Sequence, residues 1–273
     1  MPVLYKAAEG GGAVWAGPGR EVLLDAAALD SDFCEISRVT VDPGQSHLAR
    51  TGPEDIVWFQ VLRGSGNVSG RAIASSSVVL AGPDCELTIV ADSSLELLWT
   101  RLPRARRFDA TLDDLAGALR VIDWSREPVL QSEHDARTRI YVATPALVGT
   151  DAIKAEIISY PPGTSAPEHH HEGAEHFQYV LAGSGTAVLE GTAQRMEAGD
   201  IVYNYPDERH WFYTDPDATE DFVFVEVFVP GRYKTVWVEE AKTCAWLPTG
   251  RDAKGDKPAR EIAYHRSGED EGL

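Results

Sequence analysis

Histidines gather in one stretch of this sequence, at spacings that allow their side chains to meet. Of the eight histidines in 273 residues, five lie between His169 and His210. In an extended strand the side chains at i and i+2 share a face, so His169 and His171 can point at one metal ion together. His176 follows after a short loop, and His210 comes from a later strand. These four residues are therefore predicted metal ligands, since imidazole binds several transition metals.

The run of three histidines leaves a second register open. In that register His170, Glu172 and His176 would be the first three ligands. The five-residue gap that separates the run from Gly163 favours the register given above. Glu175, directly before His176, is an alternative third ligand.

Residues beside the histidines are candidates for catalytic roles. Gln178 shares a strand face with the third histidine and is expected to orient a substrate by hydrogen bonding. Tyr205 is expected to line an aromatic pocket, with a place in the core as the alternative. Glu175 or Glu172 is a candidate general base or a partner for a ligand imidazole, although each is equally suited to a solvated turn. Arg139 is a candidate for binding a substrate carboxylate.

The elements that position these residues occur twice. The blocks Val41–Gly66 and Tyr160–Gly185 each contain Pro-Gly near the start and end in Val-Leu-x-Gly-Ser-Gly. Gly44 and Gly163 are 119 positions apart, and so are the last glycines of the two blocks. In both copies, short runs of β-branched and aromatic residues alternate with Gly, Pro and Asp turn signals. This pattern predicts an all-β sandwich or barrel for each copy.

The composition between and after the copies predicts further boundaries. A capping-box pattern begins at Thr111, and leucines recur at helical spacing after it, which predicts a short helix. The segment from Lys234 to Pro248 is expected to wrap back onto a barrel. We expect an N-terminal barrel at 1–105, a linker with the short helix at 106–145, a metal-binding barrel at 146–250 and an irregular polar tail at 251–273.

The histidine pattern resembles the two motifs of the cupin superfamily, G-x5-H-x-H-x3,4-E-x6-G and G-x5-P-x-G-x2-H. Over about residues 30–230 the duplicated chain resembles a bicupin. The resemblance implies two tandem jelly-roll barrels (double-stranded β-helices) and the same four histidine ligands. Three positions depart from the motifs: His176 replaces the usual glutamate, and Tyr205 and Asp207 stand where proline and glycine are usual.

The first copy lacks the ligands. The offset of 119 maps the first three histidines to Arg50, Gly52 and Val57, and alignment of the Pro-Asp pairs maps His210 to Leu87. Glycine, valine and leucine offer no donor atom, and arginine keeps its proton. The N-terminal barrel is therefore expected to be free of metal, and to pack against the second barrel or shape access to its site.

The ligand set points to an enzyme. We expect one divalent transition metal per chain, Fe(II) in preference to Mn, Zn or Ni. The resemblance adds that cupins with three or four histidine ligands are often iron(II) dioxygenases. The first hypothesis is therefore a dioxygenase-like oxidoreductase acting on a small polar or aromatic metabolite. A Mn-, Zn- or Ni-dependent isomerase, lyase or hydrolase and a non-catalytic ligand-binding bicupin are the alternatives.

Charge and composition exclude several partners. The formal net charge of −18 argues against nucleic acid and anionic membranes as partners, because both require a basic face. No apolar run has the length of a membrane span, and the start lacks the pattern of a signal peptide. The three widely spaced cysteines are typical of reduced thiols. These features predict a cytoplasmic protein, and the resemblance implies a homodimer.

Overall fold

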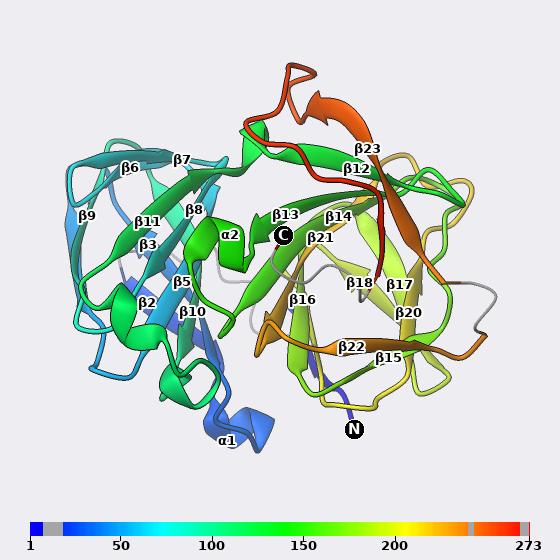
Figure 1. The fold of residues 1–273 in the computed structure, drawn as a ribbon, viewed down its shortest axis with the longest axis horizontal. Helices are drawn as coiled ribbons and strands as arrows, with labels where there is room; N and C mark the ends of the chain where they lie inside the picture. The colour runs from blue at the N-terminus through cyan, green and yellow to red at the C-terminus, as the bar shows by residue number, and fades with distance from the viewer. Residues whose placement is uncertain (8–18, 240–242, 268–272) are drawn as a thin grey trace. The chain divides into compact units, whose positions relative to one another are not determined.

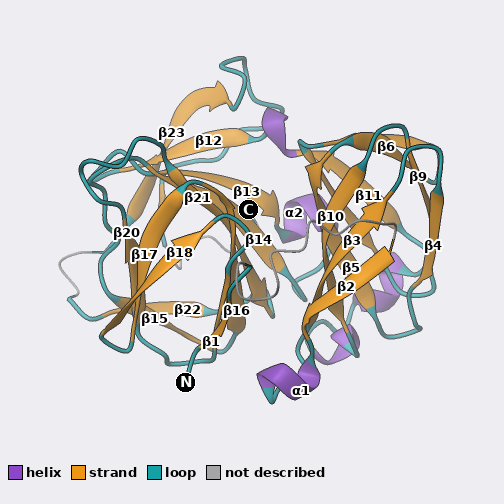
Figure 2. Cartoon of the chain, turned by 180° about the vertical axis from the view of Figure 1, so that it is seen from behind, coloured by secondary structure: helices purple, strands orange, loops and turns teal. Residues whose placement is uncertain are grey.

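Strands make up almost all of the regular structure. The computed structural model describes residues 1–7, 19–239, 243–267 and 273. Within them lie the short helices α1 (Ala26–Leu29) and α2 (Pro145–Val148) and single 3-10 turns at Ala105–Arg107, Leu112–Leu115 and Trp124–Arg126 (Figures 1 and 2). The predicted all-β class is confirmed.

The chain divides into two compact units. The first, here the N-terminal unit, comprises Gly12–Ser125 and Val148–Ala152. The second, the C-terminal unit, comprises Met1–Gly11, Arg126–Leu147 and Ile153–Leu273. Each has two antiparallel sheets, as expected of a jelly roll.

In the N-terminal unit two sheets enclose an apolar core. One sheet has the order β11-β8-β5-β10-β3-β2 and the other the order β4-β9-β6-β7. Alternate side chains point between the sheets, where Phe59 and Trp99 lie among valines, leucines and isoleucines. The strands are β2 (Gly19–Leu24), β3 (Glu35–Val41), β4 (Ser46–Arg50), β5 (Ile56–Arg63), β6 (Ser65–Val68), β7 (Arg71–Ala74), β8 (Ser77–Ala81), β9 (Glu86–Ala91), β10 (Leu95–Leu102) and β11 (Leu119–Asp123).

The C-terminal unit has the same plan with a larger first sheet. Its orders are β1-β19-β16-β21-β14-β13-β12-β23-β24 and β18-β17-β20-β15-β22. The strands are β1 (Val3–Tyr5), β12 (Pro128–Ser132), β13 (Thr138–Ala143), β14 (Lys154–Tyr160), β15 (His169–Glu172), β16 (Glu175–Ala182), β17 (Ser184–Leu189), β18 (Thr192–Glu197), β19 (Ile201–Asn204), β20 (His210–Tyr213), β21 (Phe222–Val229), β22 (Lys234–Trp237), β23 (Ala245–Asp252) and β24 (His265–Arg266).

The start of the chain belongs to the C-terminal unit. Strand β1 pairs with β19, so that Val3 lies opposite Tyr203 and Leu4 packs on the apolar core of this unit. The Lys6 ammonium binds the Asp200 carboxylate at 2.9 Å. These contacts differ from the expected boundary, which assigned residues 1–105 to one barrel.

The repeat is visible in the strands. β3 and β14, and likewise β5 and β16, are 119 positions apart at both ends. Gly64 and Gly183 close the equivalent turns with φ of +89° and +66°. A Cβ at either residue would lie 2.1 Å from a backbone oxygen, that of Ser94 or of Asp221. Only glycine fits this close approach, which explains why the motif recurs in both copies.

The predicted connecting helix is wrong in extent. A single 3-10 turn spans Leu112–Leu115, the Thr111 side chain makes no cap hydrogen bond, and Leu119 already begins β11. Ala116, with ψ of 126°, already leaves the helical conformation, and Gly117 follows with φ of +67°. The predicted return of Lys234–Pro248 is confirmed, because β22 pairs with β15 and β23 with β12. The tail predicted to be irregular contains β24.

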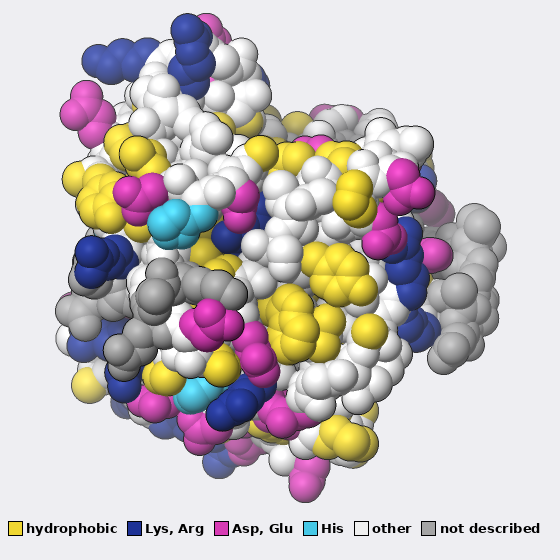
Figure 3. Space-filling view, turned by 90° about the vertical axis from the view of Figure 1, so that its right-hand side faces the viewer, with side chains coloured by type: hydrophobic (Ala, Val, Ile, Leu, Met, Phe, Trp, Pro, Cys, Tyr) yellow, Lys and Arg dark blue, Asp and Glu magenta, His cyan; other side chains and the backbone are white. Residues whose placement is uncertain are grey.

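The surface carries mixed charge. On the face shown in Figure 3, Lys and Arg side chains form separate small groups among acidic and apolar ones. In the described part of the chain no helix has both the length and the apolar character needed to cross a bilayer.

Candidate metal centre

Two facing sheets bring the four predicted histidines together. On the smaller sheet β15 pairs with β20, which places His169 directly opposite His210. On the larger sheet β16 carries His176. The ring centroids of His169 and His210 lie 4.5 Å apart, those of His171 and His176 4.7 Å, and those of His176 and His210 4.8 Å.

A glutamate that the sequence reasoning missed joins this cluster. One ligand atom from each of His171, His176, His210 and Glu226 lies within 4.8 Å of the others, and all four residues are buried. The group thus contains a carboxylate that the expected all-histidine set lacks, and the predicted ligand His169 lies outside it. Glu226 is the only charged residue in β21, whose other members are all Phe or Val. A lone charge in such a strand is a signal that could have found it.

Hydrogen bonds outside the cluster fix the orientation of three rings. The Nδ1–H groups of His169 and His210 each donate to the backbone carbonyl two residues earlier, at 2.8 and 2.9 Å. Because a carbonyl only accepts, Nε2 of both rings carries the lone pair. Nδ1 of His171 lies 3.2 Å from Oγ1 of Thr235. Ligand imidazoles in metalloproteins are held in this way by their second nitrogen.

The atoms left over face one another. Nε2 of His176 lies 3.2 Å from Nε2 of His210 and 3.9 Å from Oε1 of Glu226. Nε2 of His171 is buried without a hydrogen-bond partner among the described residues. Buried imidazole nitrogens and a carboxylate oxygen that converge in this way fit a divalent cation placed among them.

Burial sets the protonation of the cluster. Desolvation lowers the pKa of all four histidines, that of His210 to about 4, so the imidazoles are neutral at pH 7. Burial and the nearby Glu156 carboxyl raise the pKa of Glu226 to about 8 in the metal-free protein. A bound cation would favour the anionic carboxylate instead.

A row of polar residues supports Glu226. The Gln178 amide donates to its Oε1 at 2.6 Å, and Asn204 donates to the Gln178 carbonyl at 3.0 Å. In the β-ladder Gln178 and Glu156 flank Glu226 on either side. Gln178 therefore faces inward as expected. Its hydrogen bond orients the candidate metal ligand Glu226, whereas the sequence led us to expect that it orients a substrate.

The structure does not bring Glu175 and Tyr205 to the cluster. Strand alternation places Glu175 on the opposite face of β16 from His176, where its carboxylate accepts a hydrogen bond from Tyr203. The Tyr205 ring lies against that of Tyr203, with centroids 5.6 Å apart. The prediction that Glu175 and Tyr205 act at the site is therefore wrong. Glu175 points to the other face of β16, and Tyr205 packs against Tyr203.

The alternative set of ligands, His170, Glu172 and His176, does not converge in the structure. His170 and Glu172 lie on the other face of β15 and form a different group with Asp207. Glu172 pairs with the Lys234 ammonium at 3.2 Å and is exposed. His170 and Glu172 therefore do not join His176.

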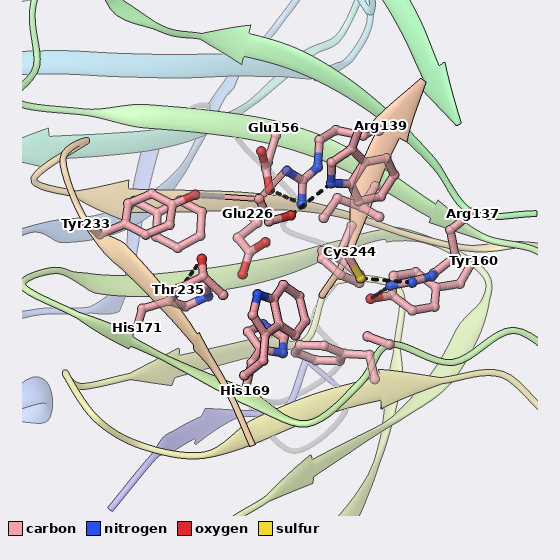
Figure 4. Close-up of a pocket in the computed structure, with 18 residues that line it drawn as sticks. Arg137, Arg139, Glu156, Tyr160, His169, His171, Glu226, Tyr233, Thr235 and Cys244 are labelled. Carbon is pink, nitrogen blue, oxygen red and sulfur yellow. Dashed lines mark hydrogen bonds and ion pairs between the residues drawn. The ribbon is translucent and has the colours of Figure 1, made fainter. Parts of the chain in front are cut away.

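A small pocket adjoins the cluster (Figure 4). The space open to water-molecule centres is about 30 Å³, enough for one or two waters. Arg139, a predicted carboxylate-binding residue, lies in its wall. The lining residues come from both sheets and from the later strands: Arg137, Arg139, Glu156, Ile158, Tyr160, Ala166, His169, His171, Phe212, Phe224, Glu226, Phe228, Tyr233, Thr235, Trp237, Cys244, Trp246 and Ser267.

Comparisons with known proteins identify the architecture. Residues 156–228 match the family model "Cupin domain". A single-residue variant of Bacillus subtilis oxalate decarboxylase has a TM-score of 0.63 with 14% identity, covering 83% of this chain and 76% of that one. The C-terminal barrel thus contains a cupin domain, and the chain as a whole has the fold of a bicupin. A second variant of the same bacterial enzyme has a TM-score of 0.63 at 16% identity with the same coverage. A third structure, from work on the Mn(II) centres of that enzyme, has a TM-score of 0.60 at 15% identity, covering 79% of the bicupin and 74% of that chain.

The N-terminal barrel of this bicupin has rings where the C-terminal barrel has its polar pair. In the N-terminal unit β5 pairs with β10 as β16 pairs with β21 in the C-terminal unit. Phe59 lies opposite Trp99 in the first pair, and Gln178 lies opposite Glu226 at the same position of the second. Phe59 and Trp99 stack, with centroids 5.2 Å apart and planes 5° apart. These two rings fill the barrel at the level where Gln178 bonds to Glu226.

The counterparts of the histidines differ by one position from the sequence alignment. Ala49 pairs with Leu87 as His169 pairs with His210, so Ala49 takes the place expected for Arg50. Arg50 is exposed and binds Glu86. Within the described residues of the N-terminal unit no group of metal-binding side chains converges.

Proposed function

We propose that this bicupin is an enzyme that uses one divalent transition metal in its C-terminal barrel. His171, His176, His210 and Glu226 would hold the metal, with His169 beside them at the pocket. One observation carries the proposal: buried donor atoms from four strands converge within 4.8 Å, and outer hydrogen bonds turn the rings of His171 and His210 so that their other nitrogens face inward.

The donor set favours Mn(II) or Fe(II). Imidazole suits Fe, Zn, Ni and Cu, whereas a carboxylate shifts preference towards harder ions such as Mn(II). When bound, such a metal polarises a substrate oxygen. The protein's own groups hold Glu226 in place through Gln178 and exclude water through the aromatic wall. The likeness to a decarboxylase with Mn(II) centres supports a lyase acting on a small metabolite.

An Fe(II) dioxygenase is the second candidate. The aromatic rings that line the pocket favour it, because they suit an apolar or aromatic substrate and dissolved oxygen. The two candidates differ in oxygen uptake. Iron in anaerobically purified protein, with oxygen consumed on a catechol or diketone, selects the dioxygenase. Manganese with no oxygen consumed selects the lyase.

The metal site is tested by removing ligands one at a time. His176→Ala and His210→Ala are each expected to lose most of the metal, because each removes an inward-facing nitrogen. Glu175→Ala is the matched control and keeps full occupancy, since its carboxylate lies on the other face. Elemental analysis of the purified variants gives the measurement. Full occupancy in both histidine variants would show that the metal binds elsewhere.

We also propose a cytoplasmic homodimer. Three buried free cysteines support a reducing compartment. Val22, 49% exposed on the edge strand β2, supports pairing between copies. Light scattering on the purified protein measures the mass, and a monomer would contradict the proposed homodimer.

A further inference from the structure

The pocket contains an arginine that meets only part of its hydrogen-bonding capacity with an anion. Arg137, 3% exposed, precedes β13. Its Nε donates to both carboxylate oxygens of Asp135, at 3.0 and 2.8 Å. Its other two nitrogens point elsewhere: Nη1 lies 3.5 Å from the Tyr160 hydroxyl and Nη2 lies 3.3 Å from the Cys244 sulfur.

The contact with Tyr160 is long, and both acceptors are poor. Burial raises the pKa of Tyr160 to about 12, so its hydroxyl stays neutral. A thiol is a weak acceptor, whereas the guanidinium is always charged and forms two parallel bonds of 2.7–2.9 Å with a carboxylate. The Nη1 and Nη2 edge of Arg137 is therefore suited to a stronger partner than the described residues provide.

The neighbouring Arg139 already has a buried anionic partner, and of its three nitrogens Nε alone lacks a hydrogen-bond partner among the described residues. Nη2 of Arg139 binds the buried Glu156 carboxylate at 3.0 Å, and Nη1 contacts the Tyr141 hydroxyl at 3.2 Å. Its guanidinium carbon lies 4.1 Å from the centre of the Trp246 ring. The charge of Arg139 is thus already balanced inside the protein.

The pocket places the two ends of a ligand. Figure 4 shows Arg137 with Tyr160 and Cys244 at one side, His169 and His171 at another, and the Glu226 carboxylate pointing into the space between them. An anionic group is attracted by the charged guanidinium of Arg137. The remainder of the same small molecule then lies towards the histidine cluster.

We propose that Arg137 is the anion-binding residue of this pocket and that the substrate is a small carboxylate. Its carboxylate replaces the contacts of Arg137 with Cys244 and Tyr160 by two charge-assisted hydrogen bonds. The assignment of the reacting end to the metal ligands rests on the proposed function, but the anion site itself does not.

The test compares acids with their uncharged amides on protein stripped of metal. Acetate and propionate are titrated against acetamide and propionamide by calorimetry, at a pH where the buried histidines are neutral. Wild-type protein is expected to bind each acid about 10- to 100-fold more tightly than its amide. This comparison needs no variant, so it stands even if a substitution of buried Arg137 prevents folding.

Variants assign the effect to one residue. Arg137→Gln is expected to lose the preference for acids, and Arg137→Lys to keep a reduced one, because lysine retains charge without the fork. Arg195→Gln, an exposed arginine of the same unit, is the control and behaves as wild type. Equal binding of acids and amides by wild type, or undiminished acid binding by Arg137→Gln, would overturn the proposal.

Metal content separates this inference from the proposed function. Arg137→Gln is expected to keep full metal occupancy, because Arg137 contacts none of the candidate ligands. A wild-type protein that holds no metal but prefers acids would refute the enzyme proposal and leave the anion site intact. A metal-loaded protein with no preference for acids would refute the anion site and leave the enzyme proposal intact.

Discussion

At the scale of single residues, a few side-chain differences separate the barrel with the candidate metal site from the barrel that is filled by aromatic rings. The larger sheet of each unit has the same ladder, yet one bears Gln178 and Glu226 where the other bears Phe59 and Trp99. A polar pair at this depth is stable only when its hydrogen bonds are met, which Gln178 and Asn204 achieve for Glu226. The stacked rings need no such partners, and they leave no room for an ion.

Gln178→Leu tests this support. The substitution leaves a side chain of similar volume but removes the donor to Glu226, so the carboxylate loses its orientation. Metal affinity is expected to fall about 10- to 100-fold, as for other residues that hold a ligand in place. Titration of the metal-free protein with Mn²⁺ gives the measurement. Glu175→Gln, on the other face of β16, is the control; equal affinities in the two variants would contradict the supporting role.

At the scale of elements, the turn between β16 and β17 fixes the approach of β21. Gly183→Ala combines a positive φ with a Cβ that meets the Asp221 carbonyl oxygen at 2.1 Å. Gly191→Ala has a similar φ of +78° but meets nothing within 4 Å. Gly191→Ala is therefore expected to cost about 1 kcal/mol of unfolding free energy, and Gly183→Ala clearly more. Denaturant unfolding of both variants isolates the cost of the close approach, and equal losses would refute it.

The repeat and the convergence of the histidines could be predicted because they depend on local spacing. The glycine turns recur at a fixed offset, and the alternation of a strand places His169 and His171 together. Glu226 could not be placed with them, because its position depends on how β21 inserts between β14 and β16. The mapping of His169 to Arg50 is wrong by one position because loop length before β4 is not constrained by the offset.

At the scale of the whole molecule, four buried imidazoles make the stability of the metal-free protein depend on pH. Burial lowers their pKa in the folded state, so unfolded chains bind more protons as pH falls below about 6.5. Folding stability is therefore lost as pH falls from about 6.5 towards about 4. For His210 alone the loss amounts to about 3 kcal/mol.

Thermal melts across this range, with and without EDTA, measure the effect. The metal-loaded protein is expected to melt higher at neutral pH and to approach the metal-free curve in acid, because protons displace the metal. The variant His210→Leu is expected to show a shallower decline of the metal-free protein. An unchanged slope in that variant would contradict the assignment.

Strand β1 also sets an order of events during synthesis. Val3–Tyr5 are made early relative to their partner Ile201–Tyr203, which follows about two hundred residues later. Until then β1 has no strand to pair with. The N-terminal barrel can fold while β1 stays unpaired. Pairing of β1 with β19 thus joins two segments that are synthesised far apart in time. The barrel that carries the metal ligands is completed last.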